Sequence, residues 1–296
     1  MIKLQGFDAG RKNGPAAVPI TRDSRGGDRT TTSVLPWGNE VSVAADRLPC
    51  VNWERTTPSR AAGQLDSQHI HLWVGGLSRV DETLASEKEC LSDPERSRAE
   101  AFTRDVDRER FIRAHAFKRR ILSAYVGVSA KDLRFESTPD GKPELAWQQR
   151  SGLAFNISHS GDLVFVGVAR DIAVGVDVEV VRAPHDLDAL VRSTFSDRER
   201  RSFEALDAAL QQEAFFAAWT RKEALIKAAG RGLSIEPHRV EVSIDPRLAP
   251  RVWAFDPFNA PKRRWTLWGA RSSSAWFAAA CCGQVRAVRR FLPPST

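Results

Sequence analysis

The 296-residue chain has few of the residues that disulfide scaffolds, cysteine–metal sites and membrane spans require. It holds four cysteines, and no two of them form a Cys-x-x-Cys pair, which excludes a zinc or redox motif of that kind. The uncharged run 272–285 has 14 residues, fewer than the ~20 that a spanning helix needs. The N-terminus lacks the apolar stretch of a secretory signal. These absences predict a soluble cytoplasmic protein with reduced cysteines.

The composition fits a globular protein with a basic surface. Hydrophobic residues make up 42% of the chain, and the length is that of one large domain or two ordinary ones. The formal net charge is +7. Such a surface favours anionic partners, which include nucleic acid, phosphorylated small molecules and acidic proteins.

The pattern along the chain divides it into three parts. Residues 1–66 are rich in Arg, Gly, Ser and Thr without periodicity, which predicts a disordered basic leader. An N-terminal α+β half is predicted over 67–175, and a C-terminal α+β half with the main motifs over 176–296. The elements expected within them are strands at 68–74, 153–157, 163–168 and 172–181, and long amphipathic helices at 107–126 and 211–229.

A short motif recurs 104 positions along the chain. Ser92–Phe102 and Ser196–Leu206 share six of eleven residues, and both carry a Ser-x-x-Glu capping box before a long helix. Chance similarity between two capped helices is one explanation. We favour an internal duplication of an α+β unit, which places an active site in the cleft between two related halves.

Two carboxylates stand two residues apart in an apolar strand. Asp177 and Glu179 therefore share a face, where their charges repel unless a cation lies between them. Oxygen ligands of this kind suit Mg²⁺. The alternative is a pair at a solvent-facing edge.

The helix 211–229 supplies a second set of charges. Glu223 lies at the margin of its apolar stripe, and Lys227 follows one turn later. This pair could be an ordinary surface ion pair. Near the end of a strand, His159 stands between Ser158 and Ser160, where it could bind a phosphate or merely fix a hairpin.

Basic residues form a further group. They occur on one helix and in the following Gly141-Lys142-Pro143 segment, and they would suit a polyphosphate ligand or form a solvated face. The helix residues are Arg108, Arg110, Arg113, Lys118, Arg119 and Arg120.

Taken together, these motifs resemble a known family. Asn156-Ile-Ser-His-Ser160, Gly175-Val-Asp-Val-Glu179 and Trp219-Thr-Arg-Lys-Glu-Ala-Leu-Ile-Lys227, followed by Gly230-Arg-Gly-Leu233, occur in that order. The ordered set resembles the 4′-phosphopantetheinyl transferases of the surfactin-synthetase-activating type, over about residues 68–285. The resemblance implies a fold of two similar α+β halves related by a pseudo-twofold axis.

The resemblance also implies a reaction and a set of site residues. The reaction moves 4′-phosphopantetheine from coenzyme A to a serine of an apo carrier protein and releases 3′,5′-ADP. By similarity, Asp177, Glu179 and Glu223 would hold Mg²⁺. Glu223 is the first candidate for the general base and Glu179 the second, while Lys227 would stabilise the departing phosphate. Coenzyme A would be bound by Arg110, Lys142, Ser158, His159, Lys222 and Lys227, with Arg98 and Arg119 as further candidates.

The implied partners are coenzyme A and an acidic acyl or peptidyl carrier protein, without nucleic acid or membrane. A monomer is expected because one chain supplies both halves. A Mg²⁺-dependent phosphodiesterase or nuclease and a basic nucleic-acid-binding module are the competing functions. The sequence leaves open which carrier is served, whether Mg²⁺ or Mn²⁺ is used in the cell, and the role of residues 1–66.

Overall fold

The computed structural model describes residues 53–78, 84–257, 264–283, 285 and 287–294, and the backbone of a short antiparallel pair, β1 (Ser33–Val34) and β2 (Glu40–Val41). Order begins earlier than residue 67, so the predicted extent of the leader is wrong for 53–66. Trp53 is buried edge-on against Phe165. β3 (Glu54–Arg55) and α1 (Pro58–Ala62) follow it. Apart from β1 and β2, the rest of the leader lies outside the described residues.

The first half of the chain builds most of a five-stranded sheet with the strand order β3-β14-β4-β8-β7. The last strand, β14 (Ala287–Leu292), lies parallel to β3 and β4, whereas the other neighbours are antiparallel. The elements of this half are β4 (His69–Gly76), α2 (Leu84–Glu89), α3 (Asp93–Glu100), α4 (Asp105–Val126), β5 (Phe135–Ser137), β6 (Pro143–Leu145), α5 (Trp147–Arg150), β7 (Leu153–Ser160) and β8 (Leu163–Arg170).

The second half builds a three-stranded antiparallel sheet with the order β12-β13-β9. Its elements are β9 (Val174–Val180), α6 (Leu187–Thr194), α7 (Asp197–Glu204), α8 (Ala208–Ala229), β10 (Glu241–Val242), β11 (Val252–Ala254), β12 (Trp265–Arg271) and β13 (Ala275–Cys282). The predicted boundary between 175 and 176 falls inside β9. The predicted C-terminal half also loses β14, which joins the first sheet.

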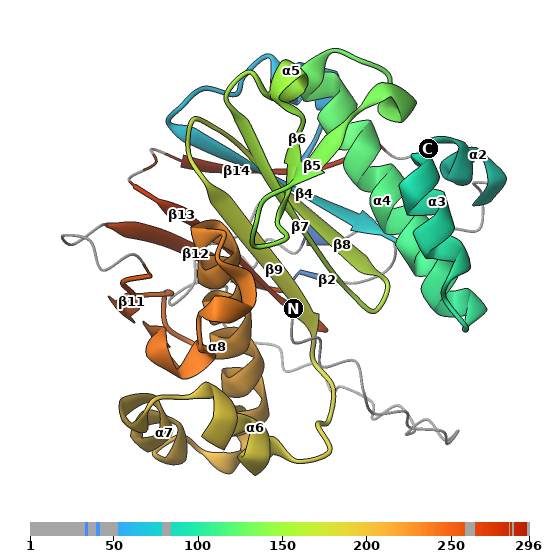
Figure 1. Cartoon of the computed structure of the whole chain (residues 1–296). Coiled ribbons are helices and arrows are strands. Elements are labelled where there is room, and N and C mark those ends of the chain that lie inside the picture. The colour runs from blue at the N-terminus through green and yellow to red at the C-terminus, as the bar shows by residue number, and fades with distance from the viewer. Residues whose placement is uncertain are drawn as a thin grey trace, which may run out of the picture.

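The two halves repeat one arrangement of elements. In each, a strand is followed by a capped helix, a helix of 22 residues that ends at a left-handed glycine, and a hairpin whose second strand pairs with the first strand. Figure 1 shows the two long helices, α4 in the first half of the chain and α8 in the second half. This topology agrees with the predicted duplication, and the predicted α+β class is confirmed.

Apolar side chains separate the layers. Val174, Val176 and Val178 of β9 pack with Leu72 and Phe165 in a core between the two sheets. Separate clusters lie beneath α4 and beneath α8. None of the helices in the described ranges is long and apolar enough to cross a membrane.

Candidate active site

The carboxylates of β9 face α8. Because side chains alternate along a strand, the valines at even positions enter the core between the sheets and the odd positions face the other way. Asp177 is buried and Glu179 is half-buried. Both therefore lie on the side of β9 that α8 covers, as the sequence predicted for their shared face.

A glycine allows α8 to approach this strand. A Cβ at Gly175 would lie 2.1 Å from the Ala224 carbonyl oxygen and 2.2 Å from the Ala228 nitrogen, which no side chain tolerates. The close approach brings Lys227 to the strand. Its Nζ lies 2.5 Å from Asp177 Oδ1 and donates to Ser158 Oγ at 3.2 Å. The pairing of Lys227 with Asp177 was not predicted.

Burial and neighbouring charges shift the pKa values of the side chains at this place. Burial raises the pKa of Asp177 above its usual range, and it raises the pKa of Glu179 to about 7, aided by the Asp177 charge. Burial and Asp177 likewise raise the pKa of Glu223 to about 7, although Lys227 opposes the shift. Burial alone would lower the pKa of Lys227, but the surrounding carboxylates raise it overall. One lysine thus faces three carboxyl groups.

These residues fit a divalent cation in charge and in ligand type. Asp177 Oδ2 is buried and has no hydrogen-bond partner among the described residues, and oxygen is the ligand that Mg²⁺ prefers. Within the described part of the chain, no three His, Cys, Asp or Glu side chains are gathered closely enough to hold a metal ion. In this structure the positive charge beside Asp177 is the ammonium group of Lys227.

Strand β7 meets β9 through polar side chains. Ser158 Oγ donates to Asp177 Oδ1 at 2.8 Å, and Ser160 Oγ donates to Glu179 Oε2 at 2.8 Å. Asn156 Oδ1 accepts from the Val176 N–H at 2.9 Å. Sequence analysis assigned no role to Asn156 and Ser160. The pattern that could have indicated a shared role is the polar residue at every second position, Asn156, Ser158 and Ser160.

His159 lies apart from the two serines. Phe155 and Ile157, the other odd positions of β7, pack in the cluster beneath α4. By alternation His159 faces that side, whereas Ser158 faces β9. The structure therefore separates two side chains that adjacent sequence positions had suggested would act together.

Lys222 does not lie with the cluster. It is fully buried, and its Nζ contacts Glu199 Oε2 at 2.5 Å and the carbonyl oxygens of Pro237 and Val240. These contacts use its three donors, so the predicted contact with coenzyme A is wrong for this arrangement. Lys222 lies 104 positions after Lys118, so the two lysines correspond in the duplicated unit. Each forms a buried ion pair with the glutamate of its own half.

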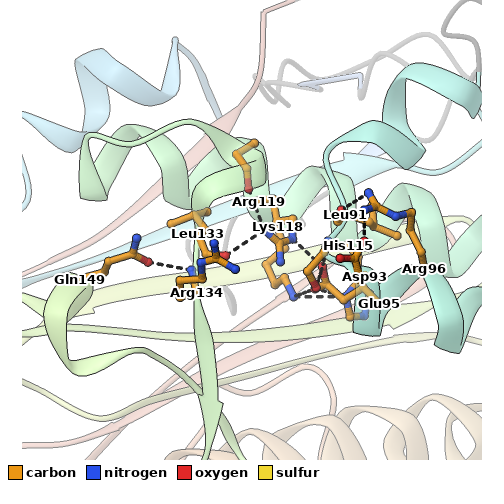
Figure 2. Close-up of polar contacts among 12 residues, drawn as sticks. Leu91, Asp93, Glu95, Arg96, His115, Lys118, Arg119, Leu133, Arg134 and Gln149 are labelled. Carbon is orange, nitrogen blue, oxygen red and sulfur yellow. Dashed lines mark hydrogen bonds and ion pairs between the residues drawn. The ribbon is translucent and has the colours of Figure 1, made fainter.

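Figure 2 shows the corresponding contacts in the first half. Lys118 Nζ lies 2.8 Å from Glu95 Oε1, and Arg119 Nε lies 2.5 Å from Glu95 Oε2. Arg119 also donates to the carbonyl oxygens of Ala130 and Leu133. Arg119, a further coenzyme A candidate, is thus occupied in joining α3, α4 and the following loop.

Lys142 and Arg110, two further basic residues predicted to bind coenzyme A, have different partners. Lys142 Nζ donates to the carbonyl oxygens of Lys227 at 2.9 Å and Val174 at 3.2 Å, so it stabilises the C-terminal end of α8. Arg110 forms an ion pair of 2.9 Å with Asp162. Lys142 thus reaches the main chain beside the carboxylate cluster.

Family models match both halves of the chain. The model of the 4′-phosphopantetheinyl transferase superfamily matches residues 173–281, and that of the 4′-phosphopantetheinyl transferase N-terminal region matches residues 79–170. The transferase HetI of Nostoc sp. is 34% identical over 181 residues, which are 61% of this chain and 76% of HetI. The chain belongs to the 4′-phosphopantetheinyl transferase superfamily. The prediction of a 4′-phosphopantetheinyl transferase is therefore confirmed at the level of this superfamily.

Other relatives match over smaller shares. The transferase psf-1 of Bacillus pumilus is 35% identical over 50% of this chain and 61% of its own length. A holo-(acyl-carrier-protein) synthase of Bacillus anthracis, solved with CoA (3′,5′-ADP), is 21% identical with a TM-score of 0.33, covering 38% of this chain and 97% of that one. The superfamily match starts just before β9 and contains Asp177, Glu179, Glu223 and Lys227.

Proposed function

We propose that this chain transfers 4′-phosphopantetheine from coenzyme A to a serine hydroxyl of an apo carrier protein and releases 3′,5′-ADP. The observation that carries the proposal is the cluster of Asp177, Glu179, Glu223 and Lys227, in a chain of this superfamily. We assign it to the surfactin-synthetase-activating type, because one chain supplies both α+β halves and the motifs of that type occur in order.

The chemistry forms one bond and breaks another. The serine oxygen attacks the phosphorus attached to pantetheine, and the bond from that phosphorus to the oxygen of 3′,5′-ADP breaks. Glu223 is our first candidate to accept the serine proton and Glu179 the second, because a carboxylate beside the attacking hydroxyl can act as a general base. Lys227 would stabilise the charge that develops on the departing phosphate.

Asp177, Glu179 and Glu223 would hold Mg²⁺ or Mn²⁺, which when bound supplies charge neutralisation at the attacked phosphorus. Lys142 borders a cavity of about 240 Å³ that Arg150, Phe155 and Asp171 also line. We include this cavity in the region that binds the nucleotide. Arg110, Ser158 and His159 remain proposed contacts of coenzyme A.

The proposed second substrate is an acidic carrier protein. A net charge of +7 would steer such a partner and raise its association rate more than its affinity. We propose a cytoplasmic monomer, since Ser158 and Ser160 of the first half hydrogen-bond to the carboxylates of the second half within one chain.

Intact-mass spectrometry tests the transfer. An apo carrier protein incubated with this protein, coenzyme A and Mg²⁺ should gain the mass of phosphopantetheine. Glu223→Gln should lower the rate by at least about a hundredfold, in the range of a lost general base, and EDTA should abolish the gain. Several apo carriers without any mass gain, together with no binding of coenzyme A, would contradict the proposal.

A further inference from the structure

The junction between the two halves consists of two strand edges that do not pair through their main chains. Within the described residues, β7 ends the five-stranded sheet and β9 ends the three-stranded sheet. The main-chain N–H groups along an edge need partners. On β9 they receive them from side chains of β7.

Each partner on β7 is an even number of residues from the other, so both face β9. Asn156 Oδ1 accepts from the Val176 N–H at 2.9 Å, and Ser160 Oγ accepts from the Val180 N–H at 3.1 Å. Asn156 and Ser160 are both buried. The polar alternation of β7 thus replaces the main-chain hydrogen bonds that a neighbouring strand would make.

Ser160 also contacts a carboxylate, in addition to the main-chain N–H group of β9. While it accepts from Val180, its own hydroxyl donates to Glu179 Oε2 at 2.8 Å. The accepted bond fixes where the hydroxyl oxygen lies, so the donated bond fixes one oxygen of the carboxylate. Asn156 lacks this second function, because its contact is with the main chain of Val176.

We propose that Ser160 is a positioning residue: through its hydrogen bond to Glu179 it sets the orientation of this carboxylate for binding a divalent cation. The inference rests on the proposed function, in which Glu179 is a cation ligand. Groups that orient a metal ligand commonly change metal affinity by about 10–100-fold when they are removed. Ser160 would act from the first half on a ligand in the second half.

The chain offers a matched control. Ser160→Ala and Asn156→Ala each remove the partner of one buried N–H of β9, so both should lower the melting temperature. Only Ser160→Ala also releases Glu179. We expect Mn²⁺ binding, measured by calorimetry or by the electron paramagnetic resonance of free Mn²⁺, to weaken about tenfold in Ser160→Ala. It should stay within about twofold of wild type in Asn156→Ala, which leaves the ligand in place.

Transfer activity gives a second reading. The Mg²⁺ concentration for half-maximal transfer should rise about tenfold in Ser160→Ala, and Ser160→Thr, which keeps the hydroxyl, should restore most of the loss. In a Glu179→Gln background, Ser160→Ala should have no further effect on Mn²⁺ binding, a comparison that stays informative if the single variant folds poorly.

The outcomes separate the two proposals. Wild-type transfer with equal Mn²⁺ affinity in Ser160→Ala and Asn156→Ala would overturn the role of Ser160 and leave the proposed function intact. A wild-type protein that binds no Mn²⁺ and modifies no carrier would overturn the proposed function and, with it, this inference.

Discussion

Lys222 and Lys227 lie five residues apart on one helix and have different surroundings. Lys227 faces Asp177, whereas Lys222 is enclosed with Glu199 beneath α7. In the sequence, Lys222 shares the apolar stripe of the helix with Trp219 and Ile226, and a lysine in such a stripe requires a buried partner. The partner, Glu199, could have been found from the 104-residue repeat. The contact between Ser160 and Glu179 could not, because it depends on how two sheets meet.

Replacing Lys222 by methionine should cost stability and spare the chemistry. Glu199 would remain buried without its cation, which costs about 3–5 kcal/mol. Transfer per folded molecule should stay near the wild-type value at a temperature well below the unfolding transition. Urea unfolding and rate measurements on the same sample test this. A Lys222→Met protein with wild-type stability and no transfer would return Lys222 to the binding site.

Lys118→Met provides the control for this prediction. Its partner Glu95 would keep Arg119 and the ring of His115, so less of its negative charge would be left unpaired. The loss of stability should therefore be smaller than in Lys222→Met.

The helices and strands were predictable where one periodicity persists. The two long helices begin within three residues of the predicted starts because each has an apolar face, and they end at the predicted residues because a glycine follows. The pairing of β14 with β4 was not predictable, since parallel neighbours from opposite ends of the chain leave no local signal. The same holds for β3, whose two residues follow a lone buried tryptophan.

At Gly175 the contact between β9 and α8 depends on one missing side chain. In Gly175→Ala, the methyl group would meet the main chain of α8 at 2.1 Å, so the helix must move away and Lys227 with it. We expect a loss of several kcal/mol, as for an overpacked core with no flexible neighbour. Soluble yield, the melting temperature and transfer should all fall.

A second glycine separates this effect from backbone strain. Gly127 has a φ of +80°, and no atom lies within 4 Å of the point that a Cβ would occupy there. Gly127→Ala should therefore cost only about 1–2 kcal/mol, the strain of a left-handed alanine. Equal losses in the two alanine variants would mean that close packing of α8 on β9 contributes nothing.

At the scale of the whole molecule, the two copies of the duplicated unit differ in what contacts the corresponding edge of their first strand. In the first half, β14 covers the outer edge of β4, and His71 and Trp73 of β4 both hydrogen-bond with the Tyr125 hydroxyl of α4. In the second half, the corresponding edge of β9 is left to the side chains of β7. The repeat in the sequence indicated two related halves. It also predicted an active site between them, but it could not show that hydroxyl groups of β7 contact the carboxylates of β9.

The same cluster should govern how the stability of the metal-free protein depends on pH. The folded-state pKa values of Glu179 and Glu223 are about 7, above the ordinary value of 4.5. Their protonated forms therefore stabilise the fold below about pH 4.5, and this stability is lost as the pH rises through 7. His71 and His115, whose pKa values burial lowers to about 4, act in the opposite direction, but their effect is complete above their ordinary value of 6.5.

Between about pH 6.5 and 8 the carboxylates should therefore dominate. We expect a loss of about 1 kcal/mol for each, seen as a decrease of several degrees in the melting temperature in EDTA. Added Mg²⁺ should raise the melting temperature more at the upper end of this range than at the lower, because a cation binds the ionised carboxylates. Glu223→Gln should remove about half of the decrease that Glu179 and Glu223 cause together, since Glu179 still titrates in this variant. A melting temperature that rises with pH across this range without metal would show that these carboxylates are already ionised in the folded protein, and the cluster would then carry its negative charge at no cost to stability.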